Sequence, residues 1–173
     1  AEDGWRLAPR DLDALCRRDL GRPRLLILNY PSNPTGCTYA PDELAALAEV
    51  ARRHGVLVIS DEIYGELHHE GAHASIARFY PEGTIISSGL SKWCGAGGWR
   101  LGTFLFPREL RWLLEAMVAV ASETYTSTSA PIQCAAVTAF QCGPEIEDYL
   151  ARERAILGAL GQWCHRRLVA AAL

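Results

Sequence analysis

The sequence predicts a three-layer α/β fold in which helices flank a mostly parallel sheet. Continuous apolar runs at residues 25–28, 56–60 and 84–87 are typical of parallel strands, because such strands are buried on both faces. Helical patterns alternate with these runs, which favours an α/β sheet. Only a short loop separates the third run from a fourth at residues 101–106, so we expect the last strand to be antiparallel.

The helices are predicted from the spacing of apolar residues and from the signals at helix ends. In residues 41–54, apolar residues recur at the i, i+3, i+4, i+7 spacing, acidic residues open the segment, and Gly55 follows its basic end. Further helices are expected at residues 11–20, 107–121, 131–141 and 145–168, and a helical turn is expected near residues 75–79.

The composition is that of one soluble domain, with 173 residues, 49% hydrophobic residues and 21% charged residues. A net charge of −3 provides no basic field for nucleic acid, and no apolar run approaches the roughly 20 residues that span a bilayer. The N-terminus lacks a signal-peptide pattern, so we expect a cytoplasmic protein with no nucleic-acid or membrane partner. The six cysteines form no Cys-x-x-Cys pair and the histidines at 68, 69 and 73 share no helical register, so no metal site is expected.

A glycine-rich stretch at residues 89–102 follows the third strand and carries Lys92 and Arg100. Spacing excludes two familiar nucleotide motifs. The Gly-Lys pair of the phosphate loop is missing, and Arg100 stands where a dinucleotide fingerprint needs its last glycine. A lysine in this position can act as an amine nucleophile, and the arginine can bind an anion.

Three polar residues follow the three predicted parallel strands: Asn33 follows the first, Asp61 the second and Lys92 the third. Ligands of open α/β sheets bind beyond the carboxyl ends of the strands. Because neighbouring strands lie about 4.8 Å apart, three strand ends span about 10 Å. That is the size of a small planar cofactor.

The residue types fit the chemistry of pyridoxal phosphate. A lysine near an arginine-bound anion, in a partly desolvated pocket, can have its pKa lowered enough to form a Schiff base with an aldehyde. A carboxylate such as Asp61 can keep a pyridinium nitrogen protonated. Asn33 and Tyr64 can donate hydrogen bonds to a phenolate oxygen, and Arg100 can bind a phosphate with two hydrogen bonds.

On these residues the sequence resembles the central part of the large domain of pyridoxal-phosphate-dependent aminotransferases of fold type I, class I/II. The resemblance implies that Lys92 in Gly-Leu-Ser-Lys is the Schiff-base lysine and that Arg100 in Gly-Trp-Arg-Leu-Gly binds the cofactor phosphate. It implies that Asp61 in Asp-Glu-Ile-Tyr pairs with the pyridinium nitrogen. It also implies that Tyr64 and Asn33, the latter in Asn-Pro-Thr-Gly, bind the phenolate oxygen.

The sequence departs from the family at the position three residues before the lysine. Family members often have a phosphate-binding serine there, whereas this chain has Gly89. Ser91 is therefore taken as the cofactor-binding hydroxyl, with Ser87 and Ser88 as alternatives.

The resemblance implies a homodimeric enzyme that uses pyridoxal 5′-phosphate to transfer an amino group from an amino acid to a 2-oxo acid. Lys92, Asp61 and Tyr64 are then the catalytic residues. Two alternatives stay open. The same core residues serve carbon–sulfur β-lyases, and aminotransferase-like domains also act as non-catalytic sensors in regulators.

The resemblance also divides the chain. Residues 1–143 correspond to part of the cofactor-binding large domain, and residues 144–173 to a helix that leads towards a C-terminal small domain. The family's upstream glycine-rich phosphate loop, its ring-stacking aromatic residue and its C-terminal substrate-binding arginine have no counterpart in the sequence. We therefore expect a chain that is truncated at both ends and inactive by itself, with residues 25–28 as an exposed apolar sheet edge.

Overall fold

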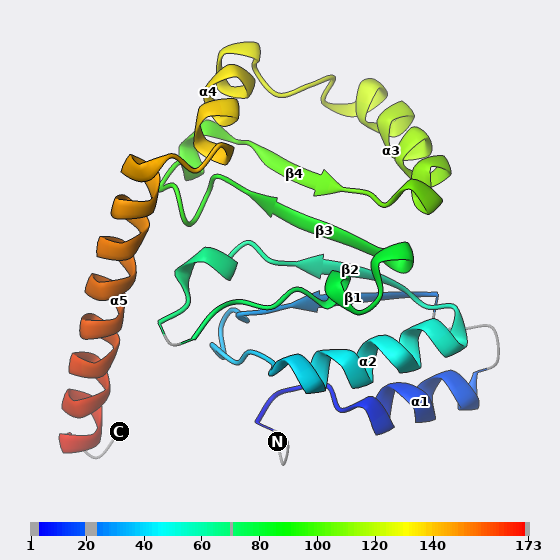
Figure 1. Cartoon of the computed structure of the whole chain (residues 1–173), viewed down its shortest axis with the longest axis horizontal. Coiled ribbons are helices and arrows are strands. Elements are labelled where there is room, and N and C mark those ends of the chain that lie inside the picture. Colours follow the sequence, from blue (N-terminus) through cyan, green and yellow to red (C-terminus); the bar gives the residue numbers. More distant parts are fainter. Residues whose placement is uncertain (1–3, 20–23, 70, 172–173) are drawn as a thin grey trace.

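The computed structural model describes residues 4–19, 24–69 and 71–171. Its centre is a four-stranded sheet in the order β1-β2-β3-β4 (Figure 1). The strands are β1 (Leu25–Asn29), β2 (Leu57–Asp61), β3 (Thr84–Gly89) and β4 (Gly102–Leu105). The first three are parallel and β4 is antiparallel to β3, which confirms the predicted α/β class and the direction of the last strand.

Helices α1 (Pro9–Arg18) and α2 (Pro41–His54) lie side by side next to β1 and β2 (Figure 1). The bounds of α2 are those predicted, because both of its ends carry strong signals. The Glu43 carboxylate accepts a hydrogen bond of 2.7 Å from the backbone N–H of Ala40, and Gly55 ends the helix with a left-handed φ of 65°. Helix α1 begins two residues earlier than predicted, and its predicted end at Leu20 lies outside the described residues.

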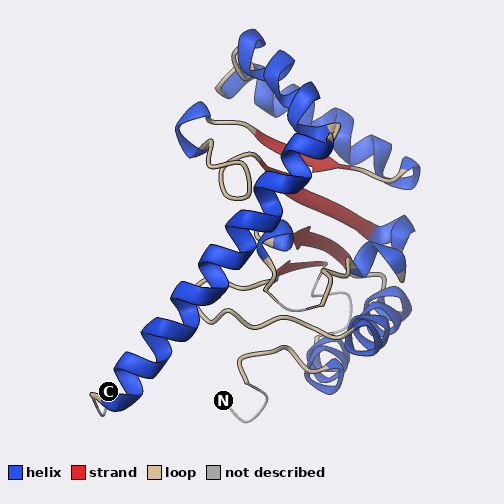
Figure 2. Ribbon diagram, turned by 60° about the vertical axis from the view of Figure 1, so that its left-hand side comes forward, coloured by secondary structure: helices blue, strands red, loops and turns tan. Residues whose placement is uncertain are grey.

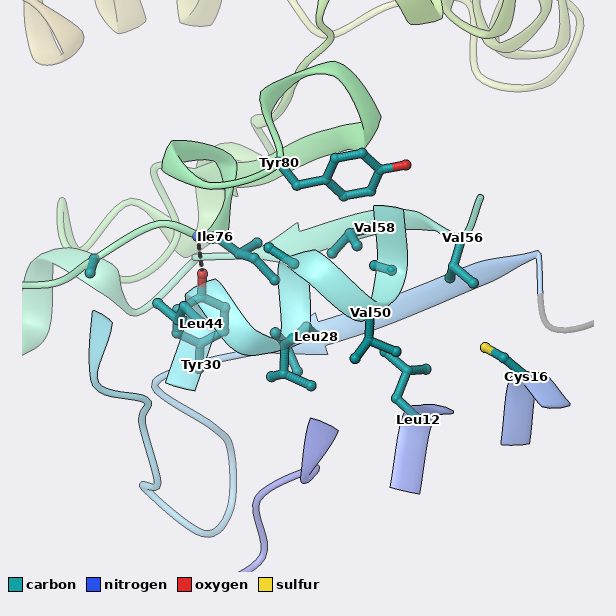
Figure 3. Packing of buried hydrophobic residues seen from close by; sticks show 14 residues of the cluster. Leu12, Cys16, Leu28, Tyr30, Leu44, Val50, Val56, Val58, Ile76 and Tyr80 are labelled. Atoms are coloured by element: carbon teal, nitrogen blue, oxygen red, sulfur yellow. Dashed lines mark hydrogen bonds between the residues drawn. The ribbon is translucent and has the colours of Figure 1, made fainter. Parts of the chain in front are cut away.

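The larger hydrophobic core lies between these two helices and the sheet (Figure 3). Tyr30 is fully buried there, and its hydroxyl accepts a hydrogen bond of 2.7 Å from the backbone N–H of Ile76. Ile76 begins a short 3-10 helix (Ile76–Arg78), which is the helical turn predicted near residues 75–79. The core thus fixes the chain directly after β1 against the long connection between β2 and β3.

The C-terminal third of the chain is helical, as predicted, with α3 (Arg111–Thr124), α4 (Ala130–Phe140) and α5 (Pro144–Ala170). The segment predicted as one helix at residues 107–121 starts with a 3-10 turn, Arg108–Leu110, and α3 ends three residues later than predicted. A second core joins α4 and the start of α5 to the loop after β3. It consists of Leu90, Trp93, Ala96, Leu101, Ala136, Ala139 and Leu150.

Several apolar side chains stay exposed. Ile27 on the edge strand β1 is 66% exposed, and α5 carries exposed Ile156, Leu160 and Trp163. The C-terminal end of α5 extends away from the sheet (Figure 2). None of the helices in the described part of the chain is long and apolar enough to cross a membrane. Helix α5 starts directly after residue 143, but its role as a link to a second domain stays a prediction.

Candidate active site

The strand ends place polar residues side by side. Asn29, Asp61 and Ser87 are register partners across β1, β2 and β3. Asp61 is the last residue of β2, and its carboxylate accepts hydrogen bonds from the Asn29 side-chain amide (3.2 Å) and from the backbone N–H of Ile63 (3.4 Å). The carboxylate therefore has a defined position at the edge of the sheet.

The turn after β1 brings Asn33 to the same edge. The backbone N–H of Asn33 donates to the Asn29 side-chain oxygen (3.0 Å), and Gly36 closes the turn with a bond to the Ser32 carbonyl (2.7 Å). Gly36 has a φ of 69°, which glycine adopts without strain. The Asn33 side-chain amide donates to the Tyr64 hydroxyl at 3.1 Å, so the two residues predicted to share one oxygen of the cofactor are in direct contact.

Lys92 lies over the ring of Tyr64. Its amine nitrogen is 5.6 Å from the centre of the Tyr64 ring, within the range of a cation–π interaction. The residue is exposed, and its carbonyl accepts a hydrogen bond from the backbone N–H of Gly95 in the turn that follows. Lys92 is also the only lysine among the 173 residues.

A backbone hydrogen bond closes the glycine-rich loop at its two ends. The backbone N–H of Leu90 donates to the Leu101 carbonyl (3.3 Å), which brings the two ends of the loop together. Arg100 has a left-handed φ of 55°, is exposed, and donates to the Gly97 carbonyl at 2.6 Å. In the described part of the chain, this bond stays within the loop, and no hydrogen bond or ion pair joins Arg100 to Asn33, Asp61 or Tyr64.

The structure explains why Gly89 cannot be replaced by the family's serine without rearrangement. A Cβ atom at this position would lie 2.6 Å from the Leu101 carbonyl oxygen, which is part of the backbone bridge at the loop ends. The phosphate-binding hydroxyl that we predict therefore belongs to another residue. Ser91, partly buried and next to Lys92, stays the predicted one, with Ser87 and Ser88 as alternatives.

Asn29 was not predicted as a site residue, although it contacts both Asp61 and the Asn33 turn. In the sequence it marks only the end of an apolar run, and a polar residue there is common in turns. The signal that identifies it is its register with Asp61, which requires the strand pairing.

Glu62 is a second unpredicted residue, and its side chain is only 11% exposed. Its carboxylate accepts hydrogen bonds from the hydroxyls of Ser60 (2.7 Å) and Ser75 (2.5 Å) and lies 2.9 Å from the Nε2 atom of His73. Burial by itself raises the pKa of Glu62, but the hydrogen bonds with His73, Ser75 and Ser60 together outweigh it and hold the pKa below its usual value. This network ties the chain after Asp61 to the connection that follows.

His68 and His73 have different partners. His73 pairs with Glu62, and His68 contacts the Gly65 carbonyl at 2.8 Å. Across residues 4–19, 24–69 and 71–171, no group of three His, Cys, Asp or Glu side chains is placed to hold a metal ion.

A cavity of about 670 Å³ opens beside the contact between Asn33 and Tyr64. Its other walls include Tyr39 on the segment before α2, Leu67 after Tyr64, and Leu157 of α5. A volume of this size holds a small organic molecule. Asn33 and Tyr64 thus lie at the boundary between the sheet edge and open space.

The residues present fit pyridoxal 5′-phosphate. A carboxylate fixed by Asn29, an amide in contact with a phenol, and an amine next to that phenol's ring all lie at or beyond the ends of three parallel strands. These are the donor and acceptor types that a pyridinium nitrogen, a phenolate oxygen and an aldehyde require. An α/β sheet with this set of side chains is the arrangement expected of a pyridoxal-phosphate enzyme.

Comparison with known proteins identifies the family. The model of the aminotransferase class I and II family matches residues 1–172, and the chain belongs to this family, whose members depend on pyridoxal phosphate. The chain is 42% identical over 128 residues to an aspartate aminotransferase of Geobacillus stearothermophilus, covering 72% of this chain and 32% of that protein. It is 39% identical over 118 residues to an aspartate/prephenate aminotransferase of Thermus thermophilus, covering 68% and 30%.

Solved structures agree with the sequence relatives. An aspartate aminotransferase from Thermus thermophilus with maleate superposes with a TM-score of 0.90 at 31% identity, covering 99% of this chain and 44% of that one. An aromatic aminotransferase from Pyrococcus horikoshii superposes with a TM-score of 0.87 at 30% identity, covering 98% and 44%. The chain therefore spans less than half the length of the relatives that it matches.

Proposed function

We propose that the protein is an aminotransferase that uses pyridoxal 5′-phosphate to transfer an amino group from an amino acid to a 2-oxo acid. The observation that carries this proposal is the meeting of Asn33, Tyr64 and Lys92, which come from the connections after three different strands. Family membership supports the same reaction class. Since the chain spans only part of its relatives, the activity is proposed for the complete gene product.

Each site residue has a role in this proposal. Asp61 accepts the hydrogen bond of the protonated ring nitrogen and keeps the proton there. Asn33 and Tyr64 hydrogen-bond to the ring oxygen. The exposed guanidinium of Arg100 and the hydroxyl of Ser91 bind the phosphate group.

Lys92 would have two roles. Its amine would hold the cofactor at the aldehyde group, and the same nitrogen, when free, would take a proton from the substrate α-carbon. When bound, pyridoxal phosphate supplies a pyridinium ring that stabilises the negative charge left by that proton. Tyr64, with its ring next to the amine, orients Lys92 for both tasks.

The names of the relatives make aspartate the first amino-donor substrate to test. The curated relatives from Geobacillus and Thermus are named for aspartate, and one related structure was determined with maleate, a dicarboxylate. We further propose that the complete protein works as a homodimer in the cytoplasm, as the family resemblance and the sequence composition lead us to expect.

The test is an amino-transfer assay on the complete protein, with aspartate and a 2-oxo acid as substrates. Wild type is expected to form the new amino acid. Lys92→Arg keeps the positive charge but lacks the nucleophilic amine, so it is expected to lose at least about a thousandfold in rate. Release of ammonia and pyruvate from a cysteine conjugate, without amino transfer, would instead support a β-lyase.

A further inference from the structure

We propose that Asn29 is a positioning residue, which sets the Asp61 carboxylate and the Asn33 turn in one fixed geometry. The inference rests on the proposed function, because it concerns the positions of Asp61 and Asn33, the proposed partners of the cofactor's ring nitrogen and ring oxygen. Asn29 itself lies at the end of β1 and is partly buried. It acts on the cofactor through its two neighbours.

The geometry of Asn29 follows from the strand register. Asn29 and Asp61 are paired residues of adjacent parallel strands, so their side chains leave the sheet on the same face. The Asn29 amide nitrogen lies 3.2 Å from the Asp61 carboxylate and 3.2 Å from the Asp61 carbonyl. Its amide oxygen accepts the backbone N–H of Asn33 at 3.0 Å. One side chain thus contacts both proposed cofactor-binding residues.

Only a side-chain amide can make this set of contacts at this size. The nitrogen end must donate twice and the oxygen end must accept once, which leaves one free acceptor site on Asn29. An aspartate at this position would place a negative charge against the Asp61 carboxylate and would have no hydrogen to donate. An alanine would remove both contacts.

The backbone around Asn29 is held independently of its side chain. The backbone N–H of Tyr30 donates to the Asp61 carbonyl (3.3 Å), and that of Glu62 donates to the Ser87 carbonyl (2.9 Å). The two strand ends therefore stay paired when the Asn29 side chain is changed. What the side chain adds is the orientation of the Asp61 carboxylate and the position of the Asn33 turn.

The test uses the complete protein and compares wild type first with Asn29→Ala, Asn29→Asp and Ser60→Ala. Ser60 is the matched control, because it is the neighbour of Asp61 on β2 and its buried hydroxyl bonds to Tyr30 and Glu62 but not to Asp61. The dissociation constant for pyridoxal phosphate and the pH midpoint of the bound cofactor's visible absorption are measured for each.

We expect Asn29→Ala to bind pyridoxal phosphate about tenfold more weakly, which is the effect of losing one hydrogen bond to a charged group. Asn29→Asp is expected to bind at least as weakly as Asn29→Ala at pH 7. The absorption midpoint is expected to rise in Asn29→Ala. A ring nitrogen with a misplaced carboxylate holds its proton less firmly, and the neutral ring then repels the proton on the nitrogen that Lys92 contributes less. Ser60→Ala is expected to keep the wild-type midpoint.

The order of the two Asn29 variants separates positioning from packing. If Asn29 only fills space, Asn29→Asp binds the cofactor like wild type because it keeps the size of the side chain. That result, or an unchanged midpoint in Asn29→Ala, would overturn the inference. Asn29→Ala is also made in a protein that already carries Asp61→Ala. There the additional loss of cofactor affinity is expected to be much smaller than the tenfold loss expected in wild type. A full tenfold additional loss would contradict a role of Asn29 through Asp61.

Failure of the proposed function has a different outcome. If wild type does not bind pyridoxal phosphate, or if Lys92→Arg shows the wild-type visible absorption, the function itself is wrong. If wild type binds the cofactor through Lys92 and the Asn29 variants are unchanged, only the inference about Asn29 is wrong.

Discussion

Replacing Glu62 with glutamine is expected to lower the free energy of unfolding by about 2 kcal/mol at pH 7. The carboxylate of Glu62 makes hydrogen bonds with Ser60, Ser75 and His73, and the side chain is only 11% exposed, so solvent screens them little. Glutamine has a similar size but no charge. At best, therefore, three hydrogen bonds to a charged group become three weaker, neutral ones.

The pH dependence of this difference follows from the sign of the pKa shift. The pKa of Glu62 is lowered in the folded protein, so its ionised form adds stability above the usual glutamate pKa, and this stability is lost as the pH falls through the folded-state value. Glutamine does not titrate. The gap between wild type and Glu62→Gln is therefore expected to be full at pH 7 and to shrink below about pH 4.5.

The measurement is urea denaturation of both proteins at pH 7 and at a series of acidic pH values. Glu82→Gln is the matched control, because Glu82 is paired with Arg52 and also has a lowered pKa, but its side chain is 44% exposed. The control is expected to stay close to wild type. Equal stability of Glu62→Gln and wild type at pH 7, or a gap that does not change with acid, would refute the reasoning.

Two further predictions concern the backbone around the site. Gly89→Ala is expected to lose about 1–3 kcal/mol of stability in thermal unfolding, because the new Cβ would lie 2.6 Å from the Leu101 carbonyl oxygen. Gly98→Ala is the control and is expected to stay near wild type, because no atom lies within 4 Å of the new Cβ. A loss in both variants or in neither would contradict this. Tyr30→Phe is expected to lose about 1–3 kcal/mol, because a buried backbone N–H loses its acceptor. Burial raises the pKa of Tyr30 to about 12, so one tyrosine of the folded wild type should ionise only near pH 12, and its earlier ionisation would contradict the account.

The fold could be predicted from the sequence where local signals agree with the pattern of burial. Helix α2 was predicted to the residue, because Pro41 opens it and Gly55 ends it. The strands were predicted to within one or two residues at each end, since apolar runs show where a strand is buried but not where its ladder of hydrogen bonds ends. The apolar pattern of α3 predicted a helix correctly, yet no residue of α3 is buried among the described parts of the chain.

The candidate site could be predicted only in part. Asn33, Asp61 and Lys92 were expected at one sheet edge because parallel strands end together. Tyr64 was predicted to share an oxygen of the cofactor with Asn33, and the structure brings these two side chains into contact. Asn29 was not predicted, because its partners follow from strand register, which a single sequence does not specify. Glu62 was not predicted either, since its partner His73 lies on an irregular connection without a periodic pattern.

Above all, we propose that Lys92 binds pyridoxal phosphate. Reduction of the protein with borohydride in the presence of pyridoxal phosphate, followed by digestion and mass spectrometry, tests it most directly. Because Lys92 is the only lysine among these 173 residues, Lys92 is the only residue of this stretch that can carry an adduct on a lysine side chain. We predict that the adduct is found on Lys92 and is absent from Lys92→Arg. An unmodified Lys92 in a protein that carries the reduced cofactor elsewhere would contradict the account.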